Sequence, residues 1–212
     1  MVDELRLWAI SIHLVRQCFA APADLAAILE NVTDSLAPAS TPAPSRGLLS
    51  KLGPLTRRPP DAPVIRHDVP NRVDAATMMT SRFIASDRLP ASWILLRAWL
   101  DRLAAAGTVI PLPRDTIDAT EFDLACAGVP SHVSIRHLWH NSLDIPLRPV
   151  GNMSVGYMDH ATANSLVGSW TAALPELHPP TLEFTAPFLQ FATVFTNPDT
   201  APLDLVAWWT YC

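Results

Sequence analysis

Three histidines lie close together in the segment SHVSIRHLWHNSLD, which spans residues 131–144. If this segment is helical, His137 and His140 share one face, which is enough for two ligands of one metal ion. A catalytic metal needs a third ligand, and the candidates are Asp144 and the more distant Asp159 and His160. The spacing matches no established zinc signature. We therefore expect ordinary histidines and no bound metal, and we keep a metal-assisted hydrolase as the alternative.

Other catalytic patterns are missing from the sequence. No serine lies in a Gly-x-Ser-x-Gly elbow, and the chain has only seven glycines, with no glycine-rich loop for phosphate. Glu121 and Asp123 point to different faces of a predicted helix, so they do not form a pair of catalytic carboxylates. Cys126 has apolar neighbours and no nearby base. The sequence therefore leans away from an enzyme, and it predicts no cofactor.

Two features favour the binding of another protein. Residues 46–72 carry a net charge of +4, including the neighbours Arg57 and Arg58, in a chain whose total charge is -5. Such a stretch is either a solvated basic loop or a docking surface for an acidic partner. Trp208 and Trp209 lie side by side in a predicted strand, so at least one ring faces a second layer, a partner or solvent. If that ring is exposed, it is a candidate anchor for an interface.

The chain is organised around a predicted helix over residues 89–107. Its apolar residues recur at helical spacing, and Arg97 and Asp101 mark the opposite face, which we expect to be solvated. Pro90 suits the first turn of a helix, and Gly107 suits a C-terminal cap. The main apolar stripe consists of Leu89, Trp93, Leu96, Leu100 and Leu103. The pattern is typical of a core helix.

The remaining pattern predicts one domain over residues 1–212, of the α+β class and mainly helical. Its small sheet is built from an N-terminal strand near 5–12, a short mid-chain strand at 154–158 and a C-terminal strand at 203–211. TVIPLP, after the central helix, is extended. Prolines crowd a long excursion at about 37–70, where neither a helix nor a central strand can persist. Further helices are predicted near 11–19, 22–36, 73–83, 115–128, 131–142, 159–175 and 184–195. Ser11 is predicted to cap the first of these, and Asp159 the one near 159–175.

Composition limits the class of protein. With 49% hydrophobic and 17% charged residues, the chain can bury a substantial core. Its mean hydropathy is +0.19, but no apolar run approaches the roughly 18 residues of a membrane-spanning helix. The negative charge disfavours nucleic acid as a partner. An acidic N-terminus without a secretory pattern, and three cysteines without short spacing, indicate a cytoplasmic protein without a disulfide framework.

One stretch of the chain resembles a known family. The order of features from FDLACAGVPSHVSIRHLWHNSLDIPL to SVGYMDHATANSLVGSWTAAL is similar to that of the small bacterial YfbM-like families of unknown function. The residues that carry the resemblance are His137, Trp139, His140, Gly156, Tyr157 and Asp159. The resemblance covers about half of the chain, and it implies an α+β domain whose activity is unassigned, so it brings no catalytic residues with it.

These observations lead to one hypothesis with an alternative. We expect a non-enzymatic cytoplasmic domain that binds another protein, as an immunity or regulatory partner, through Arg57, Arg58, Trp208 and Trp209. The alternative is a hydrolase that uses His137, His140 and Asp144, with a metal held by His137, His140 and His160.

Overall fold

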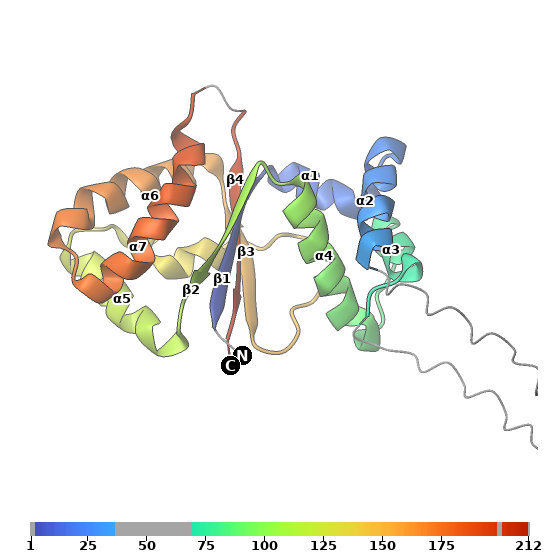
Figure 1. The fold of residues 1–212 in the computed structure, drawn as a ribbon, viewed down its shortest axis with the longest axis horizontal. Coiled ribbons are helices and arrows are strands. Elements are labelled where there is room, and N and C mark those ends of the chain that lie inside the picture. Colours follow the sequence, from blue (N-terminus) through green and yellow to red (C-terminus); the bar gives the residue numbers. More distant parts are fainter. Residues whose placement is uncertain (1–2, 37–68, 199–200, 212) are drawn as a thin grey trace, which may run out of the picture.

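The computed structural model describes residues 3–36, 69–198 and 201–211. In these residues a four-stranded antiparallel sheet stands between two layers of helices (Figure 1). The strand order is β2-β1-β4-β3. The strands are β1 (Glu4–Ile10), β2 (Ala106–Pro111), β3 (Met153–Met158) and β4 (Asp204–Thr210). The α+β class and the mainly helical character are confirmed, whereas the predicted three-stranded sheet has a fourth strand, β2.

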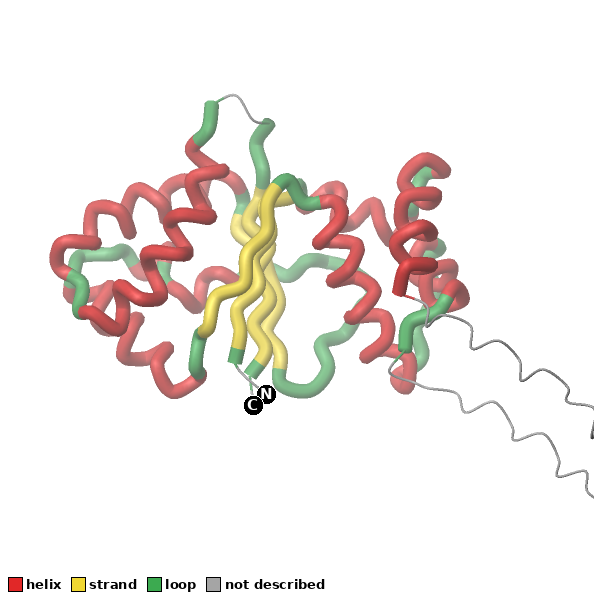
Figure 2. The backbone as a smooth tube through the Cα atoms, in the orientation of Figure 1, coloured by secondary structure: helices red, strands yellow, loops and turns green. Residues whose placement is uncertain are grey.

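The helices divide between the two faces of the sheet (Figure 2). One face is covered by α1 (Ile12–Gln17), α2 (Ala23–Leu36), α3 (Arg72–Met79) and α4 (Leu89–Leu103). The other face is covered by α5 (Ile117–Cys126), α6 (His160–Ala173) and α7 (Pro179–Ala192). The molecule therefore has two hydrophobic cores, one on each face of the sheet.

The central strand β4 is buried on both faces. Leu205, Ala207 and Trp209 point into the core under α5, α6 and α7, while Val206 and Trp208 point into the core under α4. Because helices cover both faces of the sheet, the consecutive residues 205–209 of this strand are all apolar and buried. The same arrangement explains why the N-terminal run LRLWAI does not alternate between apolar and polar residues.

Helix α4 confirms the predicted core helix over most of its length. Trp93, Leu96, Trp99 and Leu100 are buried against the sheet and against α2 and α3. The helix ends at Leu103, so the expectation that Gly107 caps it is wrong. Gly107 instead lies in β2, because the β-branched run that follows it pairs with β1.

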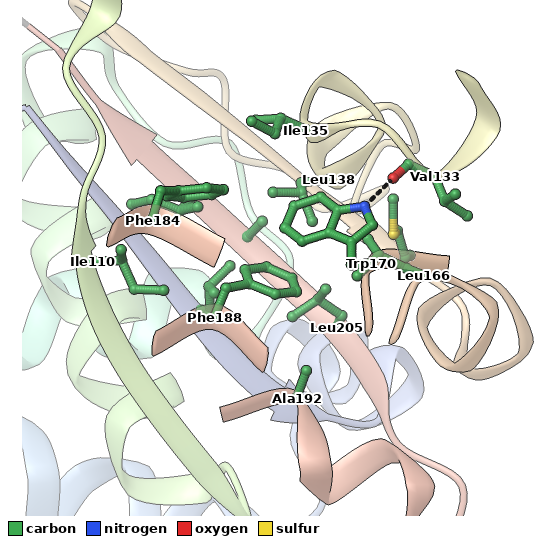
Figure 3. Packing of buried hydrophobic residues seen from close by; sticks show 14 of the residues in the cluster. Ile110, Val133, Ile135, Leu138, Leu166, Trp170, Phe184, Phe188, Ala192 and Leu205 are labelled. Carbon is green, nitrogen blue, oxygen red and sulfur yellow. Dashed lines mark hydrogen bonds between the residues drawn. The ribbon is translucent and has the colours of Figure 1, made fainter. Parts of the chain in front are cut away.

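The second core is centred on Trp170 of α6. Its indole N–H donates to the carbonyl oxygen of Val133 at 2.8 Å, and its ring packs against Phe188 with centroids 4.6 Å apart (Figure 3). The ring of Phe184 belongs to the same cluster, with its centroid 6.0 Å from that of Trp170. A buried indole with a satisfied N–H fixes the orientation of the ring, so this contact ties the irregular segment around Val133 to helix α6.

Asp204 holds the starts of two helices at one end of the sheet. One carboxylate oxygen of Asp204 accepts from the backbone N–H of Ile12 at 2.8 Å, and the other accepts from that of His160 at 3.0 Å. Ser11 makes no side-chain cap bond, so α1 is capped by Asp204 instead. The predicted cap of α6 is confirmed, because the side chain of Asp159 accepts from Thr162 N at 2.8 Å.

One further prediction is wrong, and another falls outside the described residues. Residues 131–142 do not form an α-helix but two short 3-10 turns, Ser131–Val133 and Ile135–Trp139. The excursion predicted at about 37–70 falls almost wholly on residues 37–68, outside the described residues. None of the described helices is by itself long and apolar enough to cross a membrane, although Ile12–Ala20 and Ala23–Leu36, bent by 85°, pass that test as a pair.

Candidate functional site

The structure brings the two central histidines of the predicted cluster together. The rings of His137 and His140 are stacked with centroids 4.8 Å apart, but they are presented by a 3-10 turn and not by the expected helix face. Asp144 is paired with Arg16 at 2.7 Å. His160 lies at the start of α6, with its Nδ1 3.2 Å from Leu203 O. Across residues 3–36, 69–198 and 201–211, no three His, Cys, Asp or Glu side chains are grouped closely enough to hold a metal ion.

The predicted protein-binding residues are not at an exposed surface where the structure describes them. Trp208 is 5% and Trp209 is 7% exposed, because the two faces of β4 are both covered by helices. Trp208 packs against Trp93 at 5.0 Å, and Trp209 stacks on Trp139 at 5.4 Å. The condition for an anchor, an exposed ring, is therefore not met. Arg57 and Arg58 lie outside the described residues.

An Asp–His pair links α5 to the start of α7. Asp123 accepts from the backbone N–H of His178 at 2.9 Å and from its ring Nδ1 at 2.5 Å. Burial by itself raises the pKa of Asp123, but hydrogen bonds from the His178 ring, the Thr181 hydroxyl and the His178 backbone outweigh it and hold the pKa below its ordinary value. The Thr181 hydroxyl donates to the Asp123 carboxylate and not to the His178 ring, so the histidine does not activate this hydroxyl as a nucleophile. The arrangement instead caps the start of α7.

The two edges of the sheet differ. At β3 the chain folds back against the edge, where Tyr157 N donates to Asn141 O at 3.1 Å. A Cβ on Gly156 would lie 2.5 Å from the Cα of Trp139, so only glycine allows this close approach. At the other end of the sheet, β2 has β1 as its single strand neighbour among the described residues. Within the described residues no strand or bridge lies along the outer edge of β2, so this edge is available for a further strand.

The register shows which backbone groups of β2 face this open edge. Leu112 N donates to Asp3 O at 3.2 Å, and in an antiparallel pair the hydrogen-bonded pairs alternate. Ile110 and Thr108 therefore exchange bonds with β1, whereas the N–H and C=O groups of Gly107 and Val109 point away from β1. Pro111 also belongs to the outward set, which suits an edge strand because proline has no N–H to offer.

A hollow lies on each face of this edge. The α4-side hollow, about 260 Å³, is lined by Arg6, Trp8, Asp101, Ala104, Gly107 and Val109, among others. The α7-side hollow, about 540 Å³, is lined by Thr108 together with Pro187, Gln190, Phe191 and Val194. The two share Ala106, Gly107 and Thr108. Alternate side chains of an added strand would enter the two hollows in turn.

Polar contacts hold the α4-side hollow in shape. The indole N–H of Trp8 donates to Asp101 at 2.8 Å, and Arg6 donates its Nε to Glu4 at 2.9 Å. Val109 is 47% exposed at the rim, whereas its neighbour Ile110 points to the other face and is buried. The edge therefore combines free backbone groups, an exposed apolar side chain and a preformed hollow.

Comparisons with known proteins identify no relative. No family model matches the chain, and neither a curated protein nor a solved structure matches it significantly. The resemblance to YfbM-like families accordingly stays a prediction.

The sequence reasoning missed β2 as a site. It placed Gly107 at a helix end and treated the following residues as an extended connection. The signal was present in the β-branched run Thr108, Val109 and Ile110, which ends at a proline. What the sequence did not reveal is that this strand lies at the outside of the sheet.

Proposed function

We propose that this protein is a non-enzymatic domain that binds another polypeptide as an extra strand on the open edge of β2. The observation that carries the proposal is the exposed backbone of Gly107 and Val109 between two hollows. In strand addition the main-chain hydrogen bonds provide affinity, and pockets for alternate side chains provide specificity. An open edge strand that is neither covered nor charged is otherwise a liability.

The proposal retains the cytoplasmic location expected from the sequence. Two cysteines are described, the buried Cys18 and the exposed Cys126, and both are free thiols. Free thiols are usual where the compartment is reducing. Under this proposal the protein acts as a regulatory or immunity partner, and its β2 receives a strand of the target.

The test uses linear peptides selected from a random displayed library against the full chain. The selected peptide is then titrated against two variants, Val109→Pro and Val109→Thr. Proline removes the outward N–H and leaves the bonds to β1 intact, while threonine keeps the N–H and the branched shape. One lost hydrogen bond with its local clash is worth about 1.4 kcal/mol, or tenfold in Kd.

We expect Val109→Pro to weaken peptide binding at least tenfold and Val109→Thr to change it less than twofold. Hydrogen exchange of the complex should show protection of the amides of Gly107 and Val109. Selected peptides that bind Val109→Pro as tightly as the natural chain, or that protect other amides, would overturn the proposal.

A further inference from the structure

We infer that the strand received by β2 is β2 of a second copy of this chain, so that two sheets join into one; this inference rests on the proposed function of the edge. The outward groups are self-complementary. In an antiparallel pair with its twofold axis at Thr108, Gly107 lies opposite Val109 of the other copy, and Val109 lies opposite its Gly107. Each of these pairs exchanges two backbone hydrogen bonds, so the joint contains four.

The side chains fit the same register. Gly107 and Val109 point to the α4 side of the sheet, since they pair with Trp8 and Arg6 of β1. In the pair of copies, the exposed Val109 of each lies directly opposite the Gly107 of the other. Gly107 has no side chain, and the α4-side hollow borders it. Each valine therefore enters the hollow of its neighbour, and each exposed apolar group is removed from water.

Thr108 lies on the twofold axis and faces the α7 side. Its backbone groups are used by β1, so in the joint Thr108 and its copy form a pair without mutual backbone bonds, with Cα atoms about 4.5 Å apart. Pairs of threonines are favourable at such positions. Pro111 ends the ladder because it has no N–H, which restricts the pairing to the four bonds around Thr108.

The experiment is disulfide crosslinking of the full chain in a background of Cys126→Ser and Cys212→Ser. Thr108→Cys brings two thiols together at the axis, within the Cα range of 4.4–6.8 Å that a disulfide requires, with about 4.5 Å expected. Val109→Cys is the matched control, because its two copies lie one residue to either side of the axis, an offset of two residues in all, and are roughly 8 Å apart.

We expect Thr108→Cys to form a covalent dimer at least ten times faster than Val109→Cys under the same mild oxidant. Sedimentation velocity of the natural chain should show a dimer that Val109→Pro converts to a monomer. A monomeric natural chain, equal crosslinking of the two cysteine variants, or a dimer unchanged by Val109→Pro would each overturn the inference.

The two proposals fail separately. If Thr108→Cys does not crosslink but Val109→Pro still abolishes peptide binding, the edge takes a strand from a different protein and only the second copy is refuted. If Val109→Pro changes neither the peptide affinity nor the sedimentation, the edge of β2 is not a binding site.

Discussion

Replacing Asp204 by alanine should uncouple the starts of two helices at once. The two carboxylate oxygens of Asp204 accept from Ile12 N and His160 N, at 2.8 and 3.0 Å. The first bond fixes the start of α1, which follows β1 in the chain. The second fixes the start of α6, which follows β3. These helices belong to different layers, so a single half-buried side chain connects both layers to the beginning of β4.

The expected loss follows from the two bonds. A helix N-cap contributes about 1 kcal/mol, and bonds to a charged acceptor lie at the upper end of the range for hydrogen bonds. Asp204→Ala should therefore lower the free energy of unfolding by about 2–3 kcal/mol. Asp204→Asn keeps one carbonyl oxygen and turns an amide nitrogen towards the other N–H, so about half of this loss is expected.

Urea unfolding followed by tryptophan fluorescence measures these losses. Asp159→Ala is the matched control, because Asp159 caps only α6, through Thr162 N, and its removal should cost about 1 kcal/mol. Native-state hydrogen exchange should show faster exchange of the Ile12 and His160 amides together in Asp204→Ala. An Asp204→Ala variant no less stable than Asp159→Ala, or acceleration of only one of the two amides, would refute the shared cap.

Three other changes have defined outcomes. The pKa of Asp123 is lowered in the folded chain. The ionised carboxylate therefore stabilises the fold at neutral pH, and this contribution fades as the pH falls below about 4. Urea unfolding should show Asp123→Asn to be about 2 kcal/mol less stable than the natural chain at pH 7, with the difference shrinking in acid. Gly156→Ala should lower the free energy of unfolding by about 2 kcal/mol or more, since its Cβ would lie 2.5 Å from the Trp139 backbone. Gly168→Ala, in a helix with open space around it, should instead raise the free energy of unfolding by at most about 1 kcal/mol, and thermal unfolding measures both changes. Burial raises the pKa of Cys18 to about 12, so a maleimide should label the exposed Cys126 and spare Cys18 in mass spectrometry of the native chain.

Each of these outcomes can be contradicted. An Asp123→Asn deficit that is the same at pH 3 and pH 7 would remove the carboxylate charge as its source. Equal effects of alanine at Gly156 and Gly168 would mean that the chain does not pack tightly against β3. Labelling of Cys18 at the rate of Cys126 would show that the core opens around it.

Local patterns were sufficient to predict most elements of the fold. The stripe of α4, the cap at Asp159 and the terminal strand β4 follow from periodicity and capping chemistry, which act over a few residues. The pairing order of the strands depends on contacts between distant segments. For that reason the fourth strand was missed, and Gly107 was assigned to a helix end although its neighbours pair with β1.

The candidate site was harder to predict than the fold. The burial of both Trp208 and Trp209 follows from helices on two faces of one strand, which no short window of sequence reveals. Likewise, the free groups of Gly107 and Val109 exist only because β2 comes last in the sheet. An edge is a property of topology, and residue types alone do not specify it.

The cover on β3 determines how far an assembly of this chain can grow. A sheet open on both sides can add copies without limit and become a fibre, whereas a twofold joint at a single edge closes on itself. Trp139 and Asn141 lie against β3 at Gly156 and Tyr157, so they obstruct the addition of a strand at that end of β3 and favour closure of a pair joined through β2. Loosening those residues would expose more of the β3 edge to further strands, so the close approach that Gly156 allows bears on assembly as well as on the stability of the fold.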